Sequence, residues 1–267
     1  MFVEQPRVDS FPGPNISTKR DLRNLCEVED YKTGAFKRTT FTYVDNQDVA
    51  WFGQTPDIRK YDLTVEDLNR LLQQIPDEKV YPIRPSSIST VSDADQRNLF
   101  IKRPKLLCLD DEEETKLLPQ MLLEEAEVLE FLKQHHHPNL IRYYGRTVNR
   151  GRITGIALEN HQVILQYHFK KVSNSFNIVA CMEGIRAGVE HLHALGFAHN
   201  DLNPMNIALD SNDNPIILDF RSCRRFGEQL LSAGTYGWIE EDFTTSAQRH
   251  DEFAMKKIEA WLKEKSN

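Results

Sequence analysis

The sequence predicts an α+β protein, because strand-like stretches gather in its N-terminal part, whereas long helical patterns lie between and after them. Residues 36–43 are dominated by β-branched and aromatic side chains, which are typical of strands. Residues 142–148 and 152–159 predict two further strands. Apolar residues at a spacing of three to four predict helices over about 117–134 and 177–195. With 267 residues, the chain is long enough for one large domain or two small ones.

The other predicted elements follow from helix caps, strand composition and breakers. Thr64 is a candidate N-cap for a helix over residues 65–75, and Pro76 would end that helix. Residues 79–109 predict three strands, the last of which carries Lys102 among apolar side chains. We therefore expect a sheet to precede the helix at about residue 117.

The N-terminal part of the chain has no pattern that indicates a role. Residues 1–20 contain three prolines and little hydrophobic periodicity, so we expect a flexible tail there. Residues 21–78 are expected to form an N-terminal extension.

Composition excludes several classes of protein. The net charge of -7 argues against a nucleic-acid binder. Four separated cysteines without a C-x-x-C pair favour a reducing compartment. The N-terminus lacks the apolar core of a secretory signal, and no apolar run approaches the roughly 18 residues that span a membrane. We therefore expect a soluble intracellular protein, cytoplasmic or nuclear, that binds neither nucleic acid nor membrane; no pattern indicates its oligomeric state.

The most informative stretch runs from His199 to Phe220. His199, Asp201 and Asn206 stand in the pattern H-x-D-L-x-x-x-N, and a hairpin with a polar turn then leads to Asp219 and Phe220. The stretch resembles the catalytic loop and metal-binding loop of the protein-kinase superfamily. The chemistry explains the spacing, because phosphoryl transfer needs a carboxylate at the acceptor hydroxyl, and an amide and a second carboxylate at magnesium. The alternative is a hairpin with incidental polar residues.

The resemblance implies a role for each polar residue. Asp201 would orient the acceptor hydroxyl and accept its proton, while Asn206 and Asp219 would hold Mg²⁺. Lys102 resembles the strand lysine that holds the α- and β-phosphates of ATP, and Glu125 resembles the glutamate that pairs with it. Glu125 lies on the apolar stripe of its helix, where a carboxylate needs a cation. Taken alone, Lys102 could equally be an edge-strand lysine that reaches water, and Glu125 could lie at the border of the stripe.

The resemblance extends over about residues 79–262 and is closest to small fungal kinase-like proteins. It implies a bilobal fold, with a β-rich N-lobe at residues 79–158 and a shortened helical C-lobe at residues 159–267. Glu159 and His161 would belong to the hinge that grips adenine through backbone groups. The implied cofactors are ATP and Mg²⁺, and the implied partner is a protein substrate or another protein.

Further residues fit the same family. Leu129, His199 and Phe220 resemble the hydrophobic spine of an active kinase. Asp251 precedes a helical pattern over residues 252–262 and resembles the aspartate that braces the catalytic loop. The tract from His135 to His137 invites a metal site, but three adjacent side chains point apart and do not easily converge on one ion.

Other residues depart from the kinase pattern. No glycine lies between Lys79 and Lys102, so the flexible loop that lets backbone amides approach phosphates is absent. Phe100 stands where kinases usually place alanine over adenine, and it could fill the nucleotide pocket. Arg221 replaces the glycine after Asp-Phe, Asn200 replaces an arginine that reads a phosphorylated activation segment, and Asn203 replaces a lysine.

Three functions are therefore open. The first is an ATP- and Mg²⁺-dependent phosphotransferase that modifies a hydroxyl group, on a protein by family analogy. The second is a pseudokinase that binds or scaffolds another protein. The third is a kinase of small molecules, because such enzymes also lack the arginine and lysine of the catalytic loop.

Overall fold

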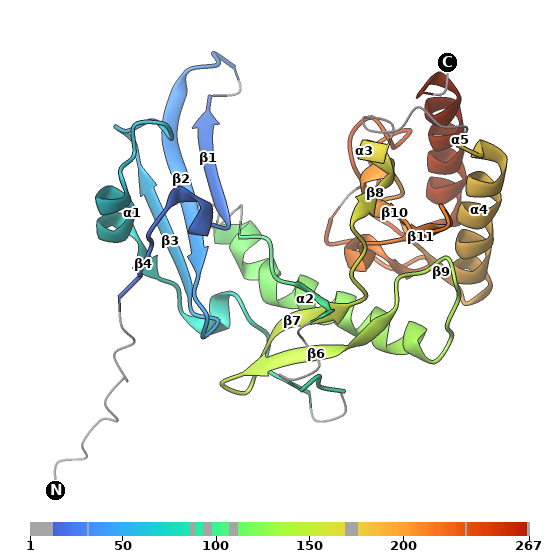
Figure 1. The fold of residues 1–267 in the computed structure, drawn as a ribbon, viewed down its shortest axis with the longest axis horizontal. Coiled ribbons are helices and arrows are strands. Elements are labelled where there is room, and N and C mark those ends of the chain that lie inside the picture. The colour runs from blue at the N-terminus through green and yellow to red at the C-terminus, as the bar shows by residue number, and fades with distance from the viewer. Residues whose placement is uncertain are drawn as a thin grey trace, which may run out of the picture. The chain divides into compact units, whose positions relative to one another are not determined.

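The computed structural model describes residues 13–30, 32–85, 89–92, 98–106, 112–168, 176–232 and 234–265 (Figure 1). The chain forms two compact units. Unit 1 contains Met1–Val80 and Lys105–Thr115, and unit 2 contains Tyr81–Pro104 and Lys116–Asn267. Each unit has its own hydrophobic core.

Unit 1 is an antiparallel sheet with one short helix. Its strands are β1 (Asn24–Glu29), β2 (Phe36–Val44), β3 (Ala50–Thr55) and β4 (Gln73–Gln74), in that order across the sheet. Helix α1 (Val65–Leu71) lies beside the sheet (Figure 1), and a 3-10 helix, η1, covers Lys19–Asp21. The core consists of large apolar side chains from the sheet, from α1 and from the segments that flank them: Ile16, Phe41, Val49, Trp51, Leu63, Leu68 and Leu72.

Two predictions in unit 1 were only partly right. Thr64 caps α1 as predicted, in a capping box with Asp67, but the helix ends at Leu71 rather than near residue 75. Gln73 and Gln74 pair instead with β3, so hydrogen bonding to a neighbouring strand replaced the last helical turn.

The predicted tail also differs in its second half. Residues 1–12 lie outside the described residues, but Ile16 is buried, with 3% of its surface exposed. Its backbone N–H donates to Oδ1 of Asn69 in α1, at 2.9 Å. Part of the stretch that was predicted to be flexible therefore packs in the core of unit 1.

Unit 2 begins with a three-stranded antiparallel sheet and a long helix. The strands are β5 (Phe100–Lys102), β6 (Tyr143–Asn149) and β7 (Arg152–Leu158), in the order β5-β7-β6. Helix α2 (Glu112–Lys133) starts before the predicted residue 117 and ends as predicted.

The predicted strands over residues 79–109 are largely wrong in the described residues. Asp77–Lys79 forms a 3-10 helix, η2, and only isolated bridges join Ile83 and Thr90 to the β6–β7 hairpin. Pro82 and Pro85 lack the N–H that a continuous strand must donate, which explains why no ladder forms around them. Residues 86–88, 93–97 and 107–109, which fall within the prediction, lie outside the described residues.

The rest of unit 2 is mainly helical. Helix α4 (Ile178–Ala194) has Asn177 as its N-cap and packs against α5 (Gln248–Lys265), as Figure 1 also shows. Strand β10 (Ile207–Leu209) pairs with β11 (Pro215–Ile217) and with β8 (Val163–Ile164). The short remaining elements are α3 (Leu165–His168), β9 (Phe197–Ala198), η4 (Pro204–Asn206), η5 (Phe220–Ser222) and β12 (Arg224–Arg225).

The architecture confirms the predicted α+β fold, with strands in the N-terminal part and helices in the C-terminal part. One core runs through unit 2 from α2 to α5, and it includes Leu129, Ile185, Leu202, Phe220 and Ile258. Among the described residues, no helix is long and apolar enough to cross a membrane. The predicted boundaries at residues 78 and 158 stay predictions.

Candidate active site

A lysine and two carboxylates meet in unit 2. Lys102 lies at the end of β5, Glu125 lies in the middle of α2, and Asp219 directly precedes η5. The Lys102 ammonium donates to Glu125 Oε1 and to Asp219 Oδ1, the latter at 2.7 Å. Glu125 is only 3% exposed, so its charge depends on this cation. Burial alone would lower the pKa of Lys102, but the two carboxylates outweigh it and raise that pKa.

The same glutamate also holds the segment after β11. The backbone N–H of Phe220 donates to Glu125 Oε1 at 3.1 Å. Asp219 has φ 57°, a left-handed conformation that aspartate tolerates better than most residues. The Phe220 ring is buried and meets the edge of His199, at 5.4 Å between ring centroids. Glu125 therefore fixes both the lysine and the backbone beside Asp219.

The two other predicted polar residues, Asp201 and Asn206, contact each other directly. Asn206 Nδ2 donates to the backbone oxygen of Asp201 at 2.8 Å and to its Oδ2 at 3.0 Å. Asp201 Oδ1 accepts from the backbone N–H and the hydroxyl of Thr235, at 2.8 and 2.7 Å. Asn203, which replaces a lysine, donates weakly to the same oxygen at 3.3 Å. The Asp201 carboxylate is thus held in one orientation by neutral donors.

The β10–β11 hairpin brings Asn206 next to the strand that leads to Asp219. Ile207 pairs with Ile217, and the N–H of Leu218 donates to the Asn206 oxygen at 2.8 Å. An amide and a carboxylate oxygen are suitable ligands for Mg²⁺. The described residues contain no group of three or more histidine, cysteine or acidic side chains that could hold a metal ion. A magnesium ion here would therefore need phosphate oxygens or water to complete its ligands.

Asp251 of α5 fixes the backbone of the loop that carries Asp201. Its buried carboxylate accepts from the N–H groups of His199 and Asn200, both at 2.8 Å, and lies 2.9 Å from His193 Nε2. The brace that the sequence predicted is therefore present, although Asp251 lies within the first turn of α5 rather than ahead of it.

Asn200 has a role that the sequence did not reveal. Its backbone is left-handed, with φ 63°, and its side chain is buried. Nδ2 donates to the backbone oxygens of Ala198 and Ser222, both at 2.9 Å, while Oδ1 lies 3.0 Å from His250 Nδ1. The sequence showed only that Asn200 stands where the kinase pattern has an arginine. The structure shows that its side-chain amide joins the catalytic loop to η5 and α5.

A second ion pair joins α2 to the segment after η5. Arg224, 6% exposed, donates to Glu124 Oε2 and to the backbone oxygens of Arg221 and Cys223. Glu124 also accepts from Gln120 on the same helix, at 2.7 Å. Consecutive glutamates of α2 therefore both bind this segment, Glu125 at Phe220 and Glu124 at Arg224. No pattern in the sequence indicates the contact between Arg224 and Glu124, because 100 residues separate the partners.

The residues predicted for adenine binding lie apart from these contacts. His161 Nε2 lies 3.2 Å from Glu159 Oε2, and the Glu159 N–H donates to the backbone oxygen of Arg142 at 2.9 Å. In the described part of the chain, no hydrogen bond or ion pair joins either residue to Lys102 or Asp219. Their role in adenine binding stays a prediction.

Two departures from the kinase pattern have visible consequences. Phe100 shares a face of β5 with Lys102 and is 52% exposed, so its ring is not packed into a closed nucleotide pocket. Arg221 brings a second cation near the other carboxylate, with its guanidinium 4.0 Å from Asp219 Oδ2. Arg221 would therefore compete with a metal ion for Asp219.

Comparison with known proteins agrees with this geometry. The family model of the protein kinase domain matches residues 88–254, more than half of the chain. A serine/threonine-protein kinase/endoribonuclease IRE1 of Hypocrea jecorina is 32% identical over 165 residues, which are 54% of this chain and 12% of that relative. The sensor for unfolded proteins in the ER, ire1, of Schizosaccharomyces pombe is 26% identical over 54% of this chain and 16% of its own length. A fatty acyl-CoA synthetase and RNA processing-associated kinase of Saccharomyces cerevisiae is 26% identical over 49% of this chain and 15% of its own. The chain thus spans only a small part of each relative.

Proposed function

Because the chain belongs to the protein kinase family, we propose that it transfers the γ-phosphate of ATP to a hydroxyl group of a protein substrate. The observation that carries the proposal is the meeting of Lys102 with Glu125 and Asp219, while the Phe220 N–H binds the same glutamate. Positioning and charge stabilisation supply most of the catalysis in phosphoryl transfer, and these groups serve both purposes.

Each residue has a distinct task in the proposed reaction. Lys102 would bind phosphate oxygens, and Glu125 would hold it in place. Asp219 and Asn206 would hold Mg²⁺, which neutralises phosphate charge when it is bound. Asp201 would accept the proton of the substrate hydroxyl through Oδ2, because Oδ1 already accepts two hydrogen bonds from Thr235.

A second candidate function is a binding module that keeps the kinase fold without catalysis. The position of Arg221 favours it, because a guanidinium near Asp219 occupies the side of the carboxylate on which a metal would otherwise be bound. The glycine-free stretch before Lys102 points in the same direction.

The first test is thermal unfolding with ATP, with and without Mg²⁺. A ligand that binds only the folded state raises the unfolding temperature. At a ligand concentration of one hundred times Kd, the free energy of unfolding rises by about 2.7 kcal/mol. We expect a rise that requires Mg²⁺ in the wild type and is lost in Asp219→Asn. Asp213→Asn is the matched control, because Asp213 lies exposed in the turn of the same hairpin. No rise at millimolar ATP in the wild type would contradict nucleotide binding.

The second test separates catalysis from binding. With labelled ATP and a mixture of protein substrates, Asp201→Asn should lose transfer by about 10²–10⁴-fold while it keeps the ATP-dependent rise in unfolding temperature. If the wild type binds ATP and transfers no phosphate, the binding module is the correct function. Transfer to sugars or amino alcohols alone would identify a small-molecule kinase.

A further inference from the structure

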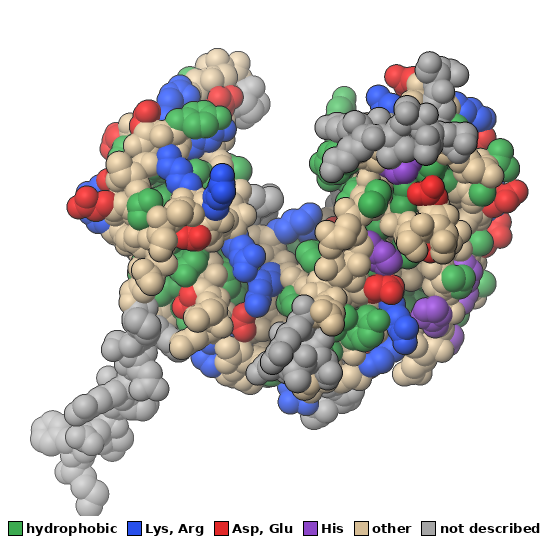
Figure 2. Space-filling view, in the orientation of Figure 1, with side chains coloured by type: hydrophobic (Ala, Val, Ile, Leu, Met, Phe, Trp, Pro, Cys, Tyr) green, Lys and Arg blue, Asp and Glu red, His purple; other side chains and the backbone are tan. Residues whose placement is uncertain are grey.

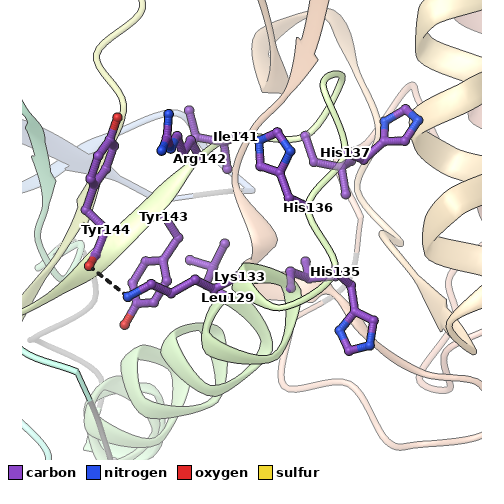
Figure 3. Close-up of a pocket in the computed structure, with 11 residues that line it drawn as sticks. Leu129, Lys133, His135, His136, His137, Ile141, Arg142, Tyr143 and Tyr144 are labelled. Atoms are coloured by element: carbon purple, nitrogen blue, oxygen red, sulfur yellow. Dashed lines mark hydrogen bonds between the residues drawn. The ribbon is translucent and has the colours of Figure 1, made fainter.

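Unit 2 contains a cavity of about 410 Å³ outside the candidate active site. The end of α2, the loop that follows it and the start of β6 form its walls (Figure 3). Lys102, Asp201, Asn206 and Asp219 do not line it. The volume lies within the range of about 300–1,000 Å³ that is usual for small-ligand sites. The cavity is therefore large enough for a small ligand of its own.

The charged groups around this cavity have one sign. Among the described residues that line it, the ionisable side chains other than two tyrosines are all basic, and none is a carboxylate: Lys133, His135, His136, His137 and Arg142. Figure 2 shows histidine side chains beside Lys and Arg side chains near the end of α2. This local excess contrasts with the net charge of -7 of the whole chain. The lining chemistry thus favours an anion.

Two of these cations come from different elements and are held at the same residue. Lys133 Nζ donates to the backbone oxygen of Tyr144 at 3.2 Å, and the Arg142 guanidinium lies over the Tyr144 ring, 5.3 Å from its centroid. Figure 3 shows both side chains on the Tyr144 side of the cavity. Tyr144 therefore contacts both cations, the Lys133 ammonium through its backbone oxygen and the Arg142 guanidinium through its ring.

No carboxylate in the described residues neutralises these two cations through an ion pair within 4.0 Å. The acidic residue closest in sequence, Glu130, already accepts from the Tyr143 hydroxyl at 3.1 Å and from the Ser89 hydroxyl at 2.7 Å. A cation at the end of a helix is favourable on its own, which accounts for Lys133. It does not account for Arg142, which lies beyond the helix and directly precedes β6.

Buried apolar side chains and a histidine complete the lining of the cavity. Leu132, Leu140 and Ile141 are buried, and His137 stacks on His191 of α4 at 4.9 Å between ring centroids. Burial, and the proximity of His191 and His136, lower the pKa of His137. An anion in the cavity would oppose this effect and raise that pKa, which makes His137 a reporter of binding.

We propose that this cavity binds a phosphomonoester, with the Arg142 guanidinium and the Lys133 ammonium as its main ligands. A guanidinium presents paired donors that match two phosphate oxygens, and an ammonium adds a point charge. The phosphate could be carried by a small molecule or by a phosphorylated side chain, since both present the same dianion. The site is independent of the proposed transfer reaction, because it shares no charged residue with it.

The test is a titration of the whole chain with O-phosphoserine, with a peptide that contains phosphoserine and with the same peptide unphosphorylated. Calorimetry gives Kd, and the histidine NMR signals report on the cavity. We expect both phosphorylated probes to bind, the unphosphorylated peptide not to bind, and the His137 signal to move. Tighter binding of the phosphopeptide identifies a protein ligand, whereas equal affinity identifies a small molecule.

Matched variants locate the binding. Lys133→Gln and Arg142→Gln should each weaken O-phosphoserine binding at least fivefold, and Arg142→Lys should lose part of the affinity because it keeps charge without the paired donors. Lys256→Gln removes an exposed lysine of α5 and should leave Kd unchanged. Equal losses of affinity in all variants, Lys256→Gln included, would overturn the site. The site would also be overturned if the wild type bound no O-phosphoserine at about 20 mM, which is twenty times a millimolar Kd.

Discussion

The catalytic loop and strand β5 carry the two halves of the candidate active site, and the fold holds them in different ways. In the loop, residues 197–206, buried side chains and backbone groups bind one another, with Asp251 and Asn200 at the centre. Strand β5 has three residues and lies at the edge of its sheet, with β7 as its neighbour. Its lysine is held in place mainly by Glu125 and Asp219, across the site.

This difference indicates which property of the protein depends on each region. The geometry of Asp201 and Asn206 follows from packing and hydrogen bonds that exist without nucleotide. The geometry at Lys102 depends on an ion cluster that a nucleotide would have to enter, next to an exposed Phe100. We therefore expect changes in the loop to affect stability first, and changes around β5 to affect nucleotide binding first.

The largest effect should come from Asp251→Ala. The change leaves the N–H groups of His199 and Asn200 buried without an acceptor, and each such group costs about 1–3 kcal/mol. We expect a loss of about 3–5 kcal/mol in the free energy of unfolding, measured with urea. Glu252→Ala, next along α5 and exposed, should change it by less than about 0.5 kcal/mol. A small effect of Asp251→Ala would show that the loop does not depend on its brace.

The second effect concerns the ion pair that joins α2 to the segment after η5. Arg224→Gln removes the ion pair with Glu124 and should lower the free energy of unfolding by about 2 kcal/mol, since hydrogen bonds to charged groups contribute about 1.5–3 kcal/mol. Because Glu125 is the next residue, the rise in unfolding temperature with ATP and Mg²⁺ should also shrink. The double variant Glu124→Arg with Arg224→Glu exchanges the two charges. It should restore part of the free energy of unfolding and part of the rise in unfolding temperature.

Two outcomes would limit this role of Arg224. A stability loss without any change in the nucleotide effect would make Arg224 a purely structural residue. Arg249→Gln is the matched control, because Arg249 is exposed on α5, and it should leave both measurements unchanged.

A smaller effect is expected at β5. Phe100→Ala removes a ring that is about half exposed, so it should cost at most about 1 kcal/mol in stability. Because the ring lies on the Lys102 face of the strand, its removal should leave ATP affinity equal or increase it, as measured by calorimetry. If Phe100→Ala lowered the free energy of unfolding as much as Asp251→Ala, strand β5 would contribute to stability as strongly as the catalytic loop.

The same contrast explains what the sequence could predict. The contact between Lys102 and Glu125 was predicted correctly. The apolar stripe of the helix indicated that Glu125 needs a cation, and the resemblance to kinases indicated Lys102 as that cation. The helices after residue 176 were also predicted, since their apolar periodicity is long. The contacts of Asn200 with Ser222 and of Arg224 with Glu124 were not predicted, because these partners lie 22 and 100 residues away and carry no matching pattern.

The strands were predicted less well for a related reason. Strand β4 is the pair Gln73–Gln74, whose polar side chains predict nothing, and it exists because β3 offers unpaired backbone groups. The stretch around Pro82 and Pro85 reads as strand by its apolar residues, yet it forms only isolated bridges. Pairing between distant segments, rather than propensity, decides these elements.

The smallest predicted effect is a dependence of stability on pH that arises at the loop. Asn200 Nδ2 faces two carbonyl oxygens, so its Oδ1 faces His250, and His250 Nδ1 must carry the proton. Among the described residues, His250 Nε2 is buried and has no hydrogen-bond partner, so protonating it would bury a second N–H without an acceptor. Burial in this way, with a smaller contribution from Arg249, lowers the pKa of His250 below 6.5.

A lowered pKa means that the unfolded chain binds more protons than the folded chain below pH 6.5, so the folded state loses stability as the pH falls through that value. Between pH 7.5 and pH 6.0 the contribution of His250 should be below about 1 kcal/mol. Urea unfolding at both values should show a smaller loss in His250→Gln than in the wild type. Equal losses would place the pH dependence elsewhere, for example at His137, and would leave the loop held by Asp251 and Asn200 independently of His250.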